Sequence, residues 1–148
     1  MQLRHDMLTH GVYVVCAQHK GQRRGLAVAW ATQVGADRLL ICAGKQSATR
    51  EWILASQAFG LSVLAKDQVK VARLFGRKSS RTVDKFESVG YHTAETGSPL
   101  LDDCIAAFDC RVEKVYEDND HKLIIGRIVY AEFVKEQSEP LIYRSKDY

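Results

Sequence analysis

Hydrophobic and polar positions in the first third of the chain follow the pattern of short β-strands. Residues 11–18 (GVYVVCAQ) are rich in β-branched side chains and are bounded by turn residues, which predicts a strand. Residues 26–34 and 38–44 predict two more strands, with 19–25 as a hairpin turn and 35–37 as a second turn. Three consecutive strands joined by tight turns predict an antiparallel meander.

Two short helices are predicted on either side of the next strand. Ser47 is a suitable N-cap for a helix over 47–57, because its hydroxyl can accept from a first-turn amide. The apolar run 59–65 predicts a strand. A second helix is predicted to begin at its cap Asp67 and to end at Gly76.

The second half of the chain contains a long irregular region followed by a hairpin. Residues 77–99 are loop-rich, whereas 104–117 and 121–134 predict two long strands that flank a polar turn. A short strand is predicted at 141–144. Six or seven strands with two short helices predict a mainly β fold, a closed or nearly closed antiparallel barrel. We expect one domain over 1–148.

Composition excludes several classes of protein. The 148 residues carry a net charge of +3, far from the excess of a dedicated nucleic-acid binder. No apolar run approaches the length of a membrane span, and the first residues lack the apolar region of a signal peptide. We therefore expect no nucleic-acid or membrane partner and a cytoplasmic location. The four cysteines lack metal-site spacing, so we expect reduced structural thiols and no metal.

Three stretches carry candidate chemistry, and each has an ordinary alternative. Residues 75–86 (FGRKSSRTVDKF) interleave cations with hydroxyls, which suits a phosphate but also a solvated loop. Residues 43–50 (AGKQSATR) lead a strand into a helix N-terminus, which favours an anion or is a simple cap. The small residues of 26–34 leave room for a flat ring or for a packed helix. His5 and His10 have no partner at ligand spacing and are interpreted as surface residues.

The ordered set of these stretches resembles the flavin reductase-like family, whose fold is an FMN-binding split β-barrel with Greek-key-like antiparallel strands. The resemblance covers residues 11 to 143. It is carried by GVYVVCA, the small-residue strand ending in Gln33-Val34, RLLICAGKQSATREWI, FGLSVLAKDQVKVARLFG, KSSRTVDKF, DHKLIIGRI and PLIY. The ordered set carries the resemblance more strongly than any single motif does.

The resemblance implies a set of cofactor contacts. The flavin ring is expected along the second strand, at Leu26, Ala27, Val28, Ala29 and Trp30. The ribityl phosphate is expected at Ala43, Gly44, Lys45, Ser47 and Thr49, under a loop that provides Arg77, Ser79, Arg81 and Lys85. His121 stands where some members place the nicotinamide.

The implied function is an NAD(P)H-dependent flavin reductase that holds FMN, or FAD, in a homodimer and passes electrons to an acceptor, which could be a protein. Two alternatives stay open: an FMN electron-transfer module without its own NAD(P)H site, and a haem- or ligand-binding split barrel. The chain departs from many relatives at Arg24, where they have Asn, and at Ala29 and Trp30, where they have small polar residues. These departures concern the ring contacts directly.

Overall fold

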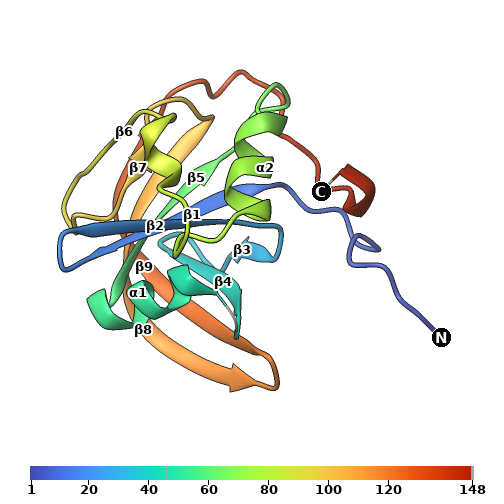
Figure 1. Ribbon diagram of the computed structural model, residues 1–148, viewed down its shortest axis with the longest axis horizontal. Coiled ribbons are helices and arrows are strands. Elements are labelled where there is room, and N and C mark those ends of the chain that lie inside the picture. The colour runs from blue at the N-terminus through green and yellow to red at the C-terminus, as the bar shows by residue number, and fades with distance from the viewer. Residues whose placement is uncertain (46, 148) are drawn as a thin grey trace.

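A computed structural model describes residues 1–45 and 47–147, the side chain of Asp147 excepted. One curled antiparallel sheet forms the body of the molecule (Figure 1). Its strands are β1 (Tyr13–His19), β2 (Gln22–Val28), β3 (Ala31–Gln33), β4 (Arg38–Gly44), β5 (Ala58–Val63), β8 (Ala106–Asp118) and β9 (His121–Phe133). The remaining elements are α1 (Ala48–Ser56), α2 (Val69–Arg77), the ribbon β6 (Tyr91–His92) with β7 (Leu100–Leu101), and 3-10 turns at Lys85–Glu87 and Ser145–Asp147.

The order of the strands shows why the barrel is split. Among the described residues the sheet runs β2-β1-β5-β8-β9-β4-β3, so β2 and β3 are its two edges. The chain passes from the β2 edge to the β3 edge through Trp30, whose carbonyl accepts from the amide of Cys42 in β4 at 2.9 Å. The expected mainly β, antiparallel split barrel is confirmed. Neither α-helix in the described part of the chain is long and apolar enough to cross a membrane.

The continuous apolar run of β1 reflects burial on both faces of the sheet. Val15 and Ala17 point into the barrel, whose interior also receives Ile53 from α1. Val14 and Cys16 point the other way, into a second core. Because neighbouring strand residues alternate between faces, a strand that is covered on both sides contains no polar interruption. All four cysteines are free thiols, and three of them are buried.

The helix α2 forms the cover of this second core by packing on β2. Phe75 is fully buried there and meets Phe86 edge-on, with ring centroids 5.4 Å apart. Gly25 of β2 lies directly beneath Phe75: a Cβ on Gly25 would come within 2.5 Å of Phe75 Cε1 and 3.2 Å of Cys16 Sγ. The absence of a side chain at Gly25 therefore sets how closely helix and strand approach.

The predicted three-stranded meander is wrong, because β2 and β3 lie at opposite edges of the sheet: β2 pairs with β1 and β3 pairs with β4. We predicted a turn over 19–25, whereas β2 already begins at Gln22 and the turn is only Lys20-Gly21. Both turn residues have positive φ, 53° and 72°, which matches the twist of a two-residue hairpin. The predicted strand 26–34 is divided after β2, because the chain crosses at Ala29-Trp30 to pair β3 with β4.

The first predicted helix is confirmed and the second needs correction at both ends. The Ser47 hydroxyl accepts from the amide of Arg50 at 3.1 Å, as a cap should. Asp67 does not cap α2: the N-cap is Gln68, whose side chain instead accepts from the Ala65 amide. Gly76 lies inside α2, which continues to Arg77.

In the second half of the chain, the structure differs from the prediction in one loop region and in the last strand. The region 77–99 contains a 3-10 turn and β6, whose Tyr91 packs edge-on against Phe86 at 5.2 Å. The long hairpin of β8 and β9 is confirmed. The predicted strand 141–144 makes one isolated bridge, between Gly11 and Ile142, and is not a strand of the sheet.

His92 ties the β6–β7 ribbon to the main sheet. Its Nδ1 lies 2.5 Å from Asp102 Oδ1 and its Nε2 lies 2.5 Å from Glu132 Oε1. The hydroxyl of Tyr130 donates to the other oxygen of Glu132. The hydrogen bond to Asp102, followed by that to Glu132, raises the pKa of His92, because both carboxylates favour the imidazolium.

This arrangement predicts a pH dependence of stability. A pKa raised on folding gives stabilisation that is complete below the unfolded value of about 6.5 and disappears as pH rises through the folded-state pKa. We expect the melting temperature of the wild type to fall relative to that of His92→Gln across this window, measured by thermal unfolding at several pH values. Parallel curves for the two proteins would contradict the assignment.

The packing at Gly25 predicts that a single methyl group destabilises the fold. We expect Gly25→Ala to lower the free energy of unfolding by about 1–3 kcal/mol, because Phe75 must move or leave its rotamer. Gly76→Ala is the matched control: its Cβ would lie 3.5 Å from that of Ala27, an ordinary contact, within a helix that favours alanine. Urea unfolding measures both, and equal stability of the two variants would refute the constraint.

Candidate functional site

A hollow lies in the gap between the two edges of the split barrel. It encloses about 240 Å³ and is lined by the whole predicted ring segment, Leu26, Ala27, Val28, Ala29 and Trp30, together with His5, Cys42, Gly44 and Tyr143. One wall is therefore the end of β2 and the facing wall is the end of β4. We call this space the ring hollow. The structure brings the predicted ring residues together in one place.

The polar edge of β2 faces this hollow. In an antiparallel strand the amide and carbonyl of one residue point to the same side, and alternate residues share that side. Gly25 turns both groups away from β1, since its amide donates to Ser80 Oγ and its carbonyl accepts from Lys85. Ala27, two residues on, therefore presents its own amide and carbonyl on the same outward edge. Its small side chain leaves this backbone accessible to a flat ligand.

His121 lies next to two residues that line the ring hollow. It opens β9 and pairs with Gly44 across to β4. Its ring centroid lies 5.3 Å from that of Trp30, at an interplanar angle of 50°. The predicted positioning residue thus contacts the lining of the hollow through Trp30 without lining it itself.

A second, smaller hollow extends the ring hollow towards α2. It encloses about 180 Å³ and shares Ala27, Val28, Ala29 and Tyr143 with the ring hollow, while Gly76 forms its far side. Arg77 follows directly at the end of α2. The cationic loop therefore begins where the groove along β2 ends.

The strand-to-helix turn contributes unequally to the site. Gly44 lines the ring hollow, and Lys45 is exposed just beyond it, its amide donating to the carbonyl of Asp120 at 2.7 Å. Ala43 and Thr49 are each only 2% exposed, so they lie beneath the surface. Ser47 uses its hydroxyl as the helix cap.

Lys85 holds the loop instead of facing its opening. The side chain is 2% exposed, and its Nζ donates to the carbonyl of Gly25 at 2.7 Å and to that of Phe75 at 2.9 Å. Burial lowers the pKa of Lys85 to about 8. This placement corrects the expectation that Lys85 contacts a phosphate, because its ammonium already donates to two backbone carbonyls inside the protein. Ser80, which was not predicted, reinforces the anchor by donating to Gly25 at 3.1 Å.

Arg81 meets Arg24 across a shared carboxylate. Glu51, in the first turn of α1, accepts from Arg81 through one oxygen and from Arg24 through the other at 3.2 Å. Arg24 also donates to the carbonyl of Ala48 at 2.9 Å and stacks on the ring of Trp52, 3.5 Å from its centroid. Two guanidinium groups on one carboxylate leave a local excess of positive charge beside the start of α1.

A polar hollow of about 440 Å³ opens next to these arginines. It is lined by the start of β2 and by the cationic loop, namely Gly21, Gln22, Arg23, Arg24, Ser80, Arg81, Thr82, Val83 and Asp84. We call it the loop hollow. Ser79, exposed at its entrance, accepts from the amide of Arg81 at 3.2 Å and so shapes the turn that presents Arg81.

Sequence reasoning missed four residues that the structure places in or beside the ring hollow and the loop. Cys42 and Tyr143 line the ring hollow, and Ser80 fastens the loop. His5, interpreted as an ordinary surface residue, is exposed but lies 5.5 Å from the ring of Trp30. The serine stood within the highlighted stretch 75–86, whereas nothing near His5 in the sequence indicates its neighbour.

Comparison with known proteins agrees with this arrangement. The profile of the "Flavin reductase like domain" matches residues 3–148. A "High molecular weight rubredoxin" of Moorella thermoacetica is 31% identical over 140 residues, covering 92% of this chain and 61% of that protein. A "Ferric-chelate reductase (NAD(P)H)" of Archaeoglobus fulgidus is 29% identical, with 92% and 82% covered. The chain thus spans less than two thirds of the first of these relatives.

A solved structure shows the same fold. The NADH:FAD oxidoreductase SgcE6 of Streptomyces globisporus superposes with a TM-score of 0.85 and 29% identity, over 92% of this chain and 82% of that one. On the strength of the nearly complete profile match, the chain belongs to the flavin reductase-like domain family.

Proposed function

We propose that the protein is an NAD(P)H-dependent flavin reductase whose flavin ring lies in the ring hollow. The observation that carries this proposal is the position of the hollow: an edge strand with accessible backbone and small side chains faces it, and His121 contacts Trp30 of its lining. The family and the names of the relatives, an NADH:FAD oxidoreductase and an NAD(P)H reductase, support the same activity.

The residues present fit a flavin at the ring end. A ring edge that carries alternating donors and acceptors requires backbone groups of both kinds, and Ala27 offers both on the outward edge of β2. Ala27 and Ala29 keep the side-chain bulk low, so a planar ring can approach this backbone. The hollow is walled by Val28 and Cys42 on either side of the split, which favours an aromatic body over a charged one.

The phosphate end is assigned to the surface around the start of α1. Arg77, Ser79 and Arg81 follow the groove that leads out of the ring hollow. The exposed Lys45 and the amides of the helix N-terminus lie on the opposite side. Arg24 adds a second guanidinium beside Arg81. The resemblance implies that many relatives have Asn near position 24 instead. In this proposal Thr49 and Lys85 support the surface from below, because both are buried.

The protein itself has to bind the flavin, orient it and shield it from water. Bound flavin supplies the hydride-accepting chemistry, so the protein requires no nucleophile or acid–base triad. Backbone amides of β2 stabilise negative charge on the ring edge without reorganising. His121 and Trp30 limit where a second ring can enter. We propose FMN as the cofactor, with FAD accommodated if its additional phosphate reaches the loop hollow.

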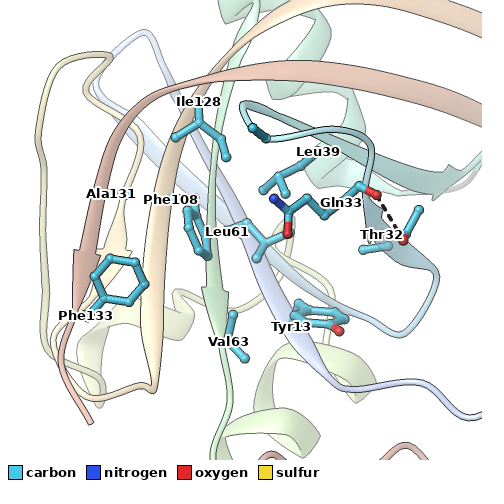
Figure 2. Close-up of a pocket in the computed structure, with 12 residues that line it drawn as sticks. Tyr13, Thr32, Gln33, Leu39, Leu61, Val63, Phe108, Ile128, Ala131 and Phe133 are labelled. Atoms are coloured by element: carbon cyan, nitrogen blue, oxygen red, sulfur yellow. Dashed lines mark hydrogen bonds between the residues drawn. The ribbon is translucent and has the colours of Figure 1, made fainter. Parts of the chain in front are cut away.

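We also propose that the protein acts as a homodimer through an apolar face of the barrel. A hollow of about 520 Å³ opens on this face. Figure 2 shows the aromatic and aliphatic side chains that line it, among them Tyr13, Leu61, Phe108 and Phe133. Phe133 is 64% exposed, a high value for so large an apolar side chain. The face continues past Ala31 to Trp30 through an adjoining hollow, so a partner there would reach the flavin site. A single-chain mass by light scattering would contradict the dimer.

We further propose that the protein is cytoplasmic and that it transfers electrons to a protein acceptor. Two monooxygenase reductase subunits, both named HsaB, are among the relatives, one from Rhodococcus jostii and one from Mycobacterium tuberculosis. An acceptor that is reduced by a diffusing or docked flavin needs no further residue from this chain. Reduced thiols at Cys16, Cys42, Cys104 and Cys110 are consistent with that compartment.

The activity is tested by spectroscopy of the purified protein. We expect added FMN to bind, and the flavin absorbance to bleach when NADH or NADPH is added without oxygen. A bound flavin that bleaches only with dithionite would replace the reductase with an electron-transfer module. Failure to bind either FMN or FAD would refute the flavin site itself.

The phosphate assignment is tested by removing one guanidinium. We expect Arg81→Ala to weaken FMN binding by about 1–3 kcal/mol, because a charge-assisted hydrogen bond is lost. Lys78→Ala removes the same charge from the same exposed loop and is the matched control. Fluorescence titration with FMN and with riboflavin, which lacks the phosphate, should show the loss for FMN alone. Equal FMN affinities of both variants would remove Arg81 from the site.

A further inference from the structure

Three aromatic rings from distant parts of the chain form a row at the mouth of the ring hollow. The ring of Trp30 lies 5.5 Å from that of His5, at 69°, and 5.3 Å from that of His121, at 50°. Its Nε1 donates to the carbonyl of His5 at 3.4 Å. His5 and Trp30 both line the ring hollow. One ring of the row comes from the N-terminal segment, one from the end of β2 and one from β9.

The N-terminal segment is held in this position by the other end of the chain. Asp6 accepts from the amide of Ser145 at 3.1 Å and from its hydroxyl at 3.2 Å. Further along, the carbonyl of His10 accepts from the amide of Tyr143 at 2.8 Å. The first and last segments therefore lie side by side, as the blue and red ends of the ribbon do in Figure 1. His5 is presented to Trp30 by a defined docking and not by chance contact of a loose end.

We infer that His5 is a positioning residue for the reductant: with Trp30 it forms the wall against which the nicotinamide of NAD(P)H lies. This inference rests on the proposed function. The neutral dihydronicotinamide ring of NAD(P)H can pack on an indole as aromatic pairs do. His5 fixes the indole by an edge contact, and its own exposed ring extends the wall beyond the hollow.

Trp30 lies between the two histidines of the row, with the N-terminal segment on one side and β9 on the other. Of the three residues, only His5 lies outside the sequence motifs that carry the resemblance to the family. The proposal therefore adds to the second-substrate site a residue that those motifs do not contain.

The experiment compares two histidines that make the same kind of contact. His5→Ala removes the ring beside Trp30, and His19→Ala removes a ring that meets Trp52 edge-on at 5.2 Å and 74°, on the other side of β2. NADH oxidation by the FMN-loaded proteins is measured over a range of NADH concentrations. We expect His5→Ala to raise the KM for NADH by about 3- to 10-fold, the size of one aromatic pair, with kcat changed less than twofold. His19→Ala should leave both constants unchanged.

Further variants separate positioning from folding. His5→Phe keeps a flat ring and should restore the KM, whereas Asp6→Ala releases the segment from Ser145 and should raise the KM as His5→Ala does. The Kd for FMN is measured for each variant, and the KM is determined with FMN in saturating excess, so that a change in flavin occupancy does not alter the KM. An unchanged KM in His5→Ala, in a protein that binds FMN and oxidises NADH, overturns the inference and leaves the proposed function standing. Failure of the wild type to bind flavin, or to bleach with NADH and NADPH, overturns both.

Discussion

The contact between Gly25 and its three partners is the constraint on which the site depends. Phe75 occupies the space that a side chain would fill, so α2 lies close against the sheet. Ser80 and Lys85 then bind the amide and carbonyl that β2 turns outward. A single backbone position thereby fixes the helix, the loop after it, and the register in which the next residues of β2 face the ring hollow. Rigid placement of this kind is what a binding loop needs from its scaffold.

The cations around Gly25 have two different roles. Lys85 gives its ammonium to carbonyls inside the protein, and the lowered pKa records the cost of that burial. Arg24 and Arg81 remain at the surface and share Glu51. In the proposed flavin site, an arriving phosphate would meet two guanidinium groups already oriented by one carboxylate. Because that carboxylate would compete with the phosphate, the site would gain preorganisation and give up some affinity.

The sequence predicted the elements that depend on local rules. Ser47 caps its helix as expected, and the hairpin of β8 and β9 is visible in alternation and turn chemistry. It did not predict the division of 26–34, since β2 ends where pairing with distant β4 begins. The residues 26–30, assigned to the flavin ring by resemblance, do line a hollow. The burial of Lys85 was not predicted, because a cation in a polar run gives no sign that two carbonyls enclose it. His5 shows the same limit: its partner Trp30 lies 25 residues away, and the neighbouring Asp6 binds Ser145, which is 139 residues away.

The docking of the two ends of the chain onto each other has a consequence for biosynthesis. Residues 5 and 143 face each other across the ring hollow, and Asp6 is bound by Ser145 at a separation of 139 residues. Loop closure over such a distance comes late in folding, after local strands and hairpins have formed. On the ribosome the barrel can assemble almost completely while this wall is still missing. In a nascent chain this entrance is therefore complete only after Tyr143 and Ser145 have emerged.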